Sequence, residues 1–279
     1  IAVTDTDPEN IYCAVKLTIK GEDKDGELAS LTVNGGTLIG NQYGICGNGT
    51  RHNTKLTING GTIESRATYD AENNIDSIAI YQPQDGTLII TGGIIKSNNT
   101  AIEIRSGSLT VNEGAVIEGG TGVPELNPNG NGGTTTNTGI AIAQHTTAKA
   151  IDVNITGGTI TGGAAVYESN PQGKDGQSPV TVNVKKAELN GDVKSSGFGG
   201  ITMDDVKIDG NVEKTGETGS KPAETQAPGQ PAPEAEPAQP EQPAPQGVGA
   251  VTGQNSYISI CSFLQEHCLT AGVAFLGYV

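Results

Sequence analysis

Large side chains are scarce in this sequence. It has no tryptophan, three phenylalanines and one methionine, and aromatic residues make up 4% of its 279 positions, whereas 41 positions are glycine. Only 17% of the residues are charged. This composition is typical of a thin solenoid core built from isoleucine, valine and leucine.

Positive charge is scarce as well. Lysine and arginine together number 16 against 31 acidic residues, which gives a formal net charge of −15. Duplex nucleic acid and anionic membrane surfaces are therefore not expected as partners of the folded domain, because both require basic patches that displace counterions. The three arginines, Arg51, Arg66 and Arg105, are too few to clamp a polyanion directly.

A short repeated unit dominates the first three quarters of the chain. In Leu56-Thr57-Ile58 apolar and polar residues alternate, as in a half-buried strand, and Asn59-Gly60-Gly61 is a turn signal. Each copy predicts a strand, a corner and a second strand. The predicted corners, separated by 19 residues (the last pair) to 44 residues (the fourth to the fifth), are Asn34, Asn59, Thr91, Asn112, Thr156, Lys185 and Asp204.

A further set of short apolar strands follows the corners. These strands are Tyr43–Cys46, Ile78–Tyr81, Ile102–Arg105, Ile140–Ala143 and Ala165–Tyr167. Strand columns joined by loops of variable length predict a parallel β-helix, whose coils stack at about 4.8 Å. Irregular coil length favours the right-handed form over the left-handed form, which keeps a strict hexapeptide repeat.

The units resemble those of right-handed, pectin-lyase-like β-helices, and more closely those of bacterial surface proteins rich in Leu-Thr-Ile-Asn-Gly-Gly-Thr-Ile coils. The resemblance covers Leu17 to Val212. It implies an all-β, single-stranded right-handed parallel β-helix over residues 1–215, with an irregular N-terminal cap over 1–30. It implies little about activity.

The chemistry of the enzymes that share this fold is not evident. Asp204-Asp205 is the only adjacent aspartate pair, and neighbouring residues of a strand point to opposite faces. Arg105 has only Glu103 in its own strand, and the three histidines, His52, His145 and His267, lie in unrelated contexts. We therefore expect no catalysis. A polysaccharide lyase or hydrolase assembled from distant coils remains the alternative.

The outward residues of the later strands supply the candidate binding site. Alignment of the five strands places two rows side by side, Cys46, Tyr81, Arg105, Ala143 and Tyr167 in one, and Gly44, Ala79, Glu103, Ala141 and Ala165 in the other. A shallow groove there would bind an extended sugar chain, because rings stack on aromatics and carboxylates pair with arginine. The candidate ligand-binding residues are Tyr81, Glu103, Arg105 and Tyr167. A merely solvated face is the alternative.

Three long loops lie next to these strands, at Ser65–Ile75, Gly119–Thr138 and Ser169–Ser178. They are either binding loops displayed at the surface or neutral insertions. Two acidic turns, at residues 5–9 and 22–27, offer oxygens to calcium, but neither completes a calcium loop, so solvated turns are preferred and no cofactor or metal ligand is expected. Cys13 and Cys46 form either a disulfide or two small buried apolar positions, whereas Cys261 and Cys268 lie in the tail.

The composition changes abruptly after the repeats. Eight prolines between Lys221 and Gln246 predict a disordered, semi-rigid stalk over residues 216–247, about 80 Å long at about 3.1 Å per residue. A ligand for proline-binding modules is the alternative. Residues 248–279 read as a short, truncated membrane or wall anchor, because their apolar end, Leu269–Val279, is shorter than the roughly 20 residues of a spanning helix. Neither terminus looks native.

Together these features predict a secreted or surface-tethered bacterial adhesin or carbohydrate-binding module. Its expected partner is a polysaccharide or a cell-surface glycan, and we expect a monomer whose β-helix does not contact a membrane. A calcium-assisted binder of acidic polysaccharide or a passive surface spacer would also fit these features.

Overall fold

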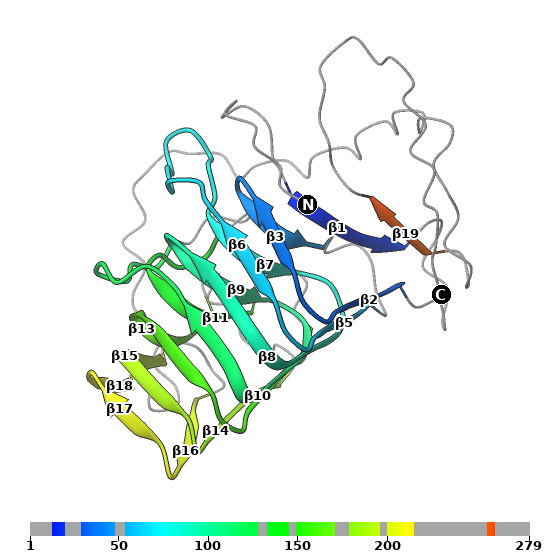
Figure 1. Ribbon diagram of the computed structural model, residues 1–279. Coiled ribbons are helices and arrows are strands. Elements are labelled where there is room, and N and C mark those ends of the chain that lie inside the picture. The colour runs from blue at the N-terminus through cyan, green and yellow to red at the C-terminus, as the bar shows by residue number, and fades with distance from the viewer. Residues whose placement is uncertain are drawn as a thin grey trace, which may run out of the picture.

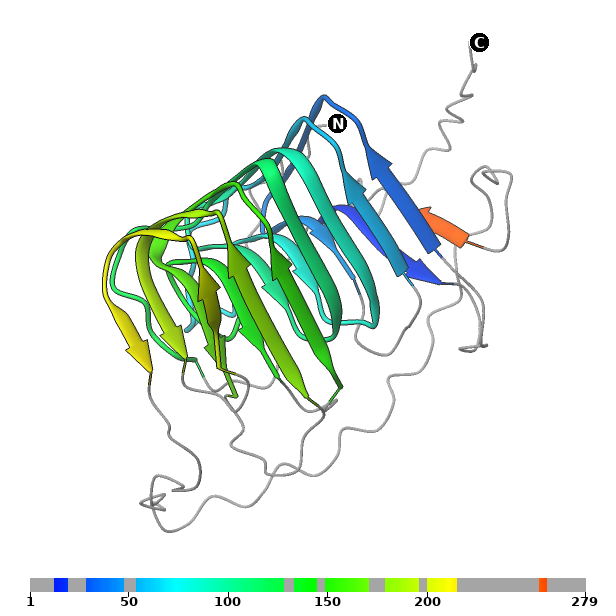
Figure 2. The ribbon, with the colours of Figure 1, turned by 90° about the horizontal axis from the view of Figure 1, so that it is seen from below.

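The chain folds into a parallel β-helix (Figure 1). The computed structural model describes residues 13–19, 29–47, 54–127, 133–144, 149–170, 179–195, 200–214 and 256–259. All regular structure in these ranges is strand, and the coils stack along one axis (Figure 2). Within them no helix is long and apolar enough to cross a membrane. The expected fold class is confirmed, while the right-handed sense of the coil stays a prediction.

The strands form three columns that run along the stack. The first column precedes the corners and holds β2 (Ala29–Val33), β5 (Thr54–Ile58), the start of β8 (Gly86–Ser97), the start of β10 (Gly107–Glu118), β12 (Ile151–Ile155), β14 (Val180–Lys185) and β16 (Thr202–Asp204). The second column follows the corners and holds β3 (Thr37–Gly40), β6 (Thr62–Ser65), the ends of β8 and β10, the start of β13 (Thr159–Ser169), the start of β15 (Glu188–Ser195) and β17 (Lys207–Asp209).

The third column contains the strands in which the binding row was expected. It holds β1 (Cys13–Ile19), β4 (Tyr43–Cys46), β7 (Ile78–Gln82), β9 (Thr100–Ile104), β11 (Thr138–Ala143), the ends of β13 and β15, and β18 (Val212–Lys214). At the outer edge of this column β19 (Ser256–Ser259) pairs antiparallel with β1. The sequence gives no sign of this last strand.

The core is a set of continuous apolar rows. In the third column equivalent positions of successive coils pair in register, and the inward row reads Ile45, Ile80, Ile102, Ile140, Val166 and Val193. In the first column the corresponding row reads Leu56, Leu88, Leu109, Val153 and Val182. All of these side chains are buried. The alternation within each strand therefore sends its apolar residues into one thin core, as the composition predicts.

The corners between the first two columns carry an exposed ladder of polar side chains. Asn59 Nδ2 donates to Asn34 Oδ1 at 2.8 Å, and Thr91 Oγ1 donates to Asn59 Oδ1 at 2.9 Å. Thr156 Oγ1 donates in the same way to Asn112 Oδ1 at 3.0 Å. We call these five residues the corner ladder. These side-chain bonds join successive coils and add to backbone bonds at the corners, such as that from the Asn59 N–H to the Val33 carbonyl at 2.8 Å.

Glycine is required at some corners by the close approach of adjacent coils. Gly61 has a φ of 90°, and a Cβ there would lie 2.6 Å from the carbonyl oxygen of Gly36 in the coil before. At the first corner, by contrast, no atom of the described residues lies within 4 Å of the Cβ position of Gly35 or Gly36. The first corner is thus open, whereas later ones are stacked.

The predicted corners occupy equivalent positions in successive coils, because the strand residues just before them pair in register. Thr91 and Asn112 lie inside the long strands β8 and β10, and the pairing of these strands is irregular there: it runs to Ile90 and Val111 and resumes at Gly92 and Gly114. Lys185 and Asp204 are the last residues of β14 and β16 and pair with each other, so the residues that turn are Lys186 and Asp205, at φ values of 51° and 52°.

The disulfide between Cys13 and Cys46 is present and joins β1 to β4, with the Cα atoms 5.9 Å apart. It resolves the choice that the sequence left open for these two residues. Several predictions fall on residues outside the described ranges: the acidic turns at 5–9 and 22–27, the three histidines, Cys261 and Cys268, the stalk and nearly all of residues 248–279.

Candidate functional site

The predicted binding row is wrong in its register. Tyr81 pairs with Glu103 rather than Arg105, and Ala141 pairs with Tyr167. A slip of two residues leaves the inward and outward faces of a strand unchanged, so the apolar pattern of β7 and β9 fits either register equally well. Tyr81 and Tyr167 are therefore three strands apart, about 14 Å at the usual strand spacing.

The row is also not an open groove. Glu103 is 0% exposed and Arg105 is 3% exposed, and Tyr167 is buried as well. The Arg105 Nε donates to Glu103 Oε1 at 2.6 Å, and the Arg105 guanidinium carbon lies 5.2 Å from the centre of the Tyr81 ring. The sequence predicted that all four candidate residues, Tyr81, Glu103, Arg105 and Tyr167, face a ligand. In the structure three of them are covered, and Arg105 already has an anionic partner.

The cover is the second long loop, residues 119–137, whose residues 128–132 lie outside the described ranges. Thr134 donates its backbone N–H to Glu103 Oε2 at 2.9 Å and its hydroxyl to Glu103 Oε1 at 3.2 Å. The neighbouring Gly133 N–H donates to Asp76 Oδ1 at 3.0 Å, and the Tyr43 hydroxyl donates to Asp76 Oδ2. We call Tyr43, Asp76, Glu103, Arg105 and Thr134 the buried cluster. It fastens the loop to the third column.

Burial sets the electrostatics of this cluster. It raises the pKa of the Glu103 carboxyl, and the Arg105 guanidinium and the Thr134 N–H offset part of that increase. Burial also raises the pKa of the Tyr43 hydroxyl, which the Asp76 carboxylate raises further. The Glu103–Arg105 pair at the centre of the cluster is therefore buried and hydrogen-bonded beneath the loop.

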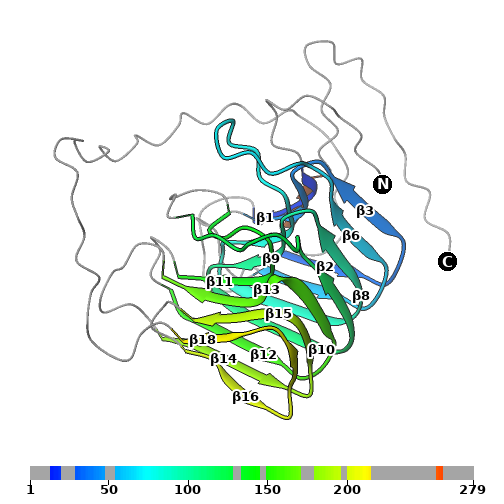
Figure 3. The same cartoon turned by 90° about the vertical axis from the view of Figure 1, so that its left-hand side faces the viewer.

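A pocket lies instead between the two described long loops. It has a volume of about 430 Å³, and its lining includes Tyr69, Asn98, Asn99, Glu125, Thr136 and Asn137. We call it the loop pocket. Residues 66–77 supply one wall and residues 119–137 the other, and both loops lie on the side of the stack that carries β9 and β11 (Figures 1 and 3).

Hydrogen bonds hold the loop pocket in shape. Asn127 Nδ2 donates to the Tyr69 hydroxyl at 3.3 Å and so links the two loops. Asn137 N–H donates to Asn99 Oδ1 at 2.8 Å, and Asn137 Nδ2 donates to the Val123 carbonyl at 3.0 Å. The pocket is thus built by contacts between residues up to 58 positions apart in the chain.

One polar group at this pocket has no partner. Asn99 is 3% exposed, and its Oδ1 accepts a bond, but its Nδ2 has no hydrogen-bond partner among the described residues. The hydroxyl of buried Thr135, which precedes the pocket-lining Thr136, also has no hydrogen-bond partner among the described residues. Buried donors without partners are costly, and they are satisfied in most proteins by water or a ligand. The loop pocket therefore contains unused hydrogen-bonding capacity.

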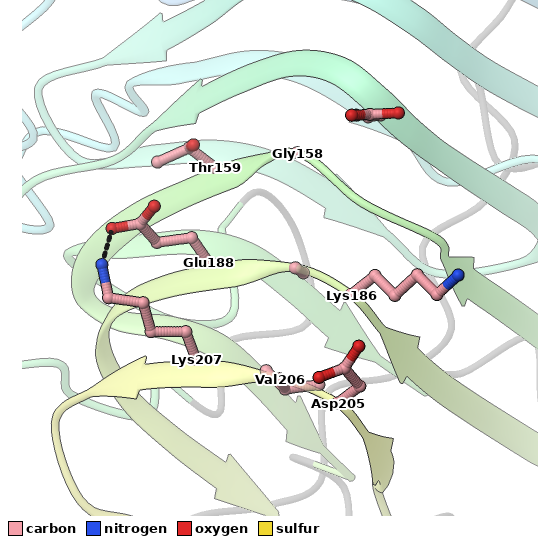
Figure 4. A pocket seen from close by; sticks show the side chains of 9 residues that line it. Gly158, Thr159, Lys186, Glu188, Asp205, Val206 and Lys207 are labelled. Carbon is pink, nitrogen blue, oxygen red and sulfur yellow. Dashed lines mark hydrogen bonds and ion pairs between the residues drawn. The ribbon is translucent and has the colours of Figure 1, made fainter.

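A second hollow lies over the corners of the last coils. It has a volume of about 570 Å³ and is lined by charged side chains that include Glu113, Lys186, Glu188, Asp205 and Lys207 (Figure 4). We call it the corner pocket. Lys207 Nζ pairs with Glu188 Oε1 at 2.8 Å, and Figure 4 shows Lys186 pointing away from that pair. Both signs of charge are mixed there and no aromatic ring lines it, so it resembles an ordinary solvated face.

The sequence singled out the two loops that line the loop pocket, but it did not single out the individual lining residues. Tyr69, Asn98 and Asn99 lie in or next to Ser65–Ile75 and β9, and no spacing rule connects them to Glu125 or Asn137. An aromatic residue inside a long polar loop was the one available signal for Tyr69. In the described part of the chain no group of three or more histidine, cysteine or acidic residues is placed to hold a metal ion.

Comparison of the chain with protein-family models, with curated proteins and with solved structures gives no match. The function is therefore inferred from the geometry of the molecule.

Proposed function

We propose that this protein is a secreted or surface-tethered bacterial β-helix of the pectin-lyase-like kind that binds glycans as an adhesin or carbohydrate-binding module and performs no reaction. The loop pocket carries the proposal. There one aromatic ring, three asparagines and one carboxylate line a hollow on a rigid frame. Sugars suit such a site, because their rings stack on tyrosine and their hydroxyls bond to amides and carboxylates.

The Cys13–Cys46 disulfide supports an extracytoplasmic location. Such bonds persist in oxidising compartments and are rare in the bacterial cytosol. Residues 216–247, with their high proline content, would then hold the β-helix away from the surface to which the chain is attached.

A lyase or hydrolase is less well supported. Two carboxylates, those of Asp76 and Glu103, do converge beneath the second loop, since consecutive N–H groups of Gly133 and Thr134 bind them. General acid or base catalysis requires a carboxyl within hydrogen-bond reach of the substrate. Glu103 is fully covered and bound to Arg105, so it is fastened in a structural role.

The test is a glycan array probed with the full chain, with and without calcium, followed by product analysis on every hit. We expect retention without turnover, and we expect Tyr69→Ala and Asn98→Ala to abolish it while the melting temperature stays within a few degrees. Tyr69→Phe keeps the ring and loses only the hydroxyl, so it should retain most of the binding. Lys186→Ala, in the corner pocket, is the matched control and should bind as the parent does.

Each outcome favours a different function. Release of oligosaccharides from a bound polymer would show that the protein is an enzyme rather than a binding module. If the Tyr69→Ala variant still retained the glycan, the binding site would lie outside the loop pocket. No retention by any glycan would favour a protein-binding adhesin or a passive spacer.

A further inference from the structure

The charge of the loop pocket restricts what it can hold. Glu125 is the only ionisable acid or base among the side chains that line it; the tyrosine hydroxyl aside, the other polar groups are amides and hydroxyls. A ligand carboxylate, sulfate or phosphate placed there would face a carboxylate and no cation. Juxtaposed like charges at an interface cost free energy and are a common way to reject a wrong partner.

The cations nearest to the loop pocket are already engaged. Asn98 Nδ2 bonds to the backbone carbonyl of Arg66, which places Arg66 at the pocket's edge. Its Nε pairs with Glu64 Oε1 at 2.8 Å, and Lys96 Nζ approaches Glu64 Oε2 at 3.5 Å. Arg105, on which recognition of acidic sugars was expected to rest, is buried against Glu103. Both described arginines, Arg66 at the pocket's edge and Arg105 in the buried cluster, therefore already pair with a glutamate that an anionic sugar would have to displace.

The neutral groups of the pocket suit hydroxyls. An amide donates and accepts, as a sugar hydroxyl does, and Asn98, Asn99 and Asn137 bring three amides to one hollow. The Asn99 Oδ1 is fixed as the acceptor of the Asn137 N–H, so its free atom is the donor Nδ2, which a ligand oxygen would satisfy. Because Asn99 is almost fully covered, the second loop must shift slightly for an oxygen to reach it.

From these contacts we infer that the loop pocket binds an uncharged hexose unit and rejects uronic, sulfated and other acidic sugars. The inference rests on the proposed glycan-binding function and narrows its ligand class. The Tyr69 ring supplies the stacking surface, and the asparagine amides form hydrogen bonds with the hydroxyls. Glu125 accepts a hydrogen bond from a hydroxyl and repels anions.

The experiment uses matched polymers that differ only at the carboxylate group. Polygalacturonate, alginate and hyaluronan are compared with the same polymers after their carboxylates have been reduced to hydroxymethyl groups. The full chain is tested against each by affinity electrophoresis and calorimetry at low and high salt. We expect at least one reduced polymer to bind at least roughly tenfold more tightly than its parent, with little dependence on salt.

Glu125→Gln sharpens the test. It removes the negative charge and keeps an acceptor oxygen. It should therefore reduce the difference in affinity between the reduced polymer and its parent, while binding of the neutral polymer persists. Asn99→Leu removes the free donor and also the acceptor of the Asn137 N–H, so it should weaken binding of the neutral polymer and lower the melting temperature by a few degrees.

Two failures are distinguishable. A parent polymer that binds as tightly as its reduced form, or better, overturns the neutral-sugar inference and leaves the glycan-binding proposal standing. If no reduced polymer, no parent polymer and no glycan of the array is bound, the glycan-binding proposal falls and the inference falls with it.

Discussion

The corner ladder and the buried cluster lie on the same β-helix but use polar side chains in opposite ways. At the corners the polar groups are neutral and largely exposed, and they bond to their equivalents one coil away. Beneath the second loop they are charged and buried, and they bond to residues 31 and 57 positions away. The ladder follows from the repeat, whereas the buried cluster depends on one inserted loop. The two regions should therefore respond very differently to substitution.

The largest effect is expected from removal of the buried cation. Arg105→Met leaves the Glu103 carboxylate covered and without its ionic partner, and should lower the free energy of unfolding by about 3–5 kcal/mol. Lys207→Met breaks the exposed pair with Glu188 and should change the free energy of unfolding far less, because solvent screens that pair. Urea unfolding of both variants measures the difference. Equal losses would mean that the buried cluster is no more important than a surface pair.

Backbone strain at the corners should give the next largest effect. Gly61→Ala places a Cβ against the Gly36 carbonyl at a positive φ and should destabilise by about 1–3 kcal/mol. Gly35→Ala enters open space and should change stability by less than about 0.5 kcal/mol. Thermal unfolding of the two variants tests this contrast between adjacent coils. A neutral Gly61→Ala would show that the corners are not closely stacked.

The hydrogen bonds of the corner ladder should contribute less to the free energy of unfolding. Asn59→Ala removes one donor and one acceptor and should cost about 1 kcal/mol, since both bonds are solvent-exposed. Asn34→Ala removes only the end acceptor and should cost about half as much. Chemical denaturation resolves this order. If Asn34→Ala proved the more harmful, the ladder would not act through its hydrogen bonds.

The smallest effect is expected in the pH dependence of stability, to which two glutamates should contribute with opposite signs. Burial raises the pKa of Glu103, so its contribution to stability falls as the pH rises from the ordinary glutamate range through the raised value. Arg66 lowers the pKa of Glu64, so its contribution is lost as the pH falls through the lowered value. Each slope is at most about 1.4 kcal/mol per pH unit.

Unfolding free energies measured from acid to neutral pH for the parent, Glu103→Gln and Glu64→Gln isolate the two contributions. The parent should lose stability relative to Glu103→Gln as the pH rises, and gain stability relative to Glu64→Gln. Slopes of the same sign for both glutamates would contradict the assigned environments.

The parts of the fold that repeat could be predicted from the sequence. Alternating residues such as Leu56-Thr57-Ile58 define both the strand and its buried face, and Asn59-Gly60-Gly61 marks a bend with one glycine at positive φ. The register of β7 on β9 could not be predicted, because Ile80 and Ile78 are equivalent in pattern and only the loop between the strands decides which of them pairs with Ile102.

The candidate site was predicted only to the level of its loops. The pattern correctly described Glu103 and Arg105 as outward residues, but it contained no information on what lies over them. Their burial depends on Gly133 and Thr134, whose neighbours in the chain are glycine, asparagine and threonine without any apolar periodicity. Contacts between such a loop and a distant strand leave no trace in local sequence.

The open first corner also determines where the protein is expected to deamidate during storage. In an asparagine–glycine pair the glycine nitrogen can attack the side-chain carbonyl carbon, ammonia leaves, and water opens the ring to aspartate or isoaspartate. Asn59 is held at both ends of its amide by neighbouring coils, whereas Asn34 is held only at its oxygen and is followed by an uncrowded glycine. Among the described corners, Asn34 is where we expect stored protein to acquire its first extra negative charge.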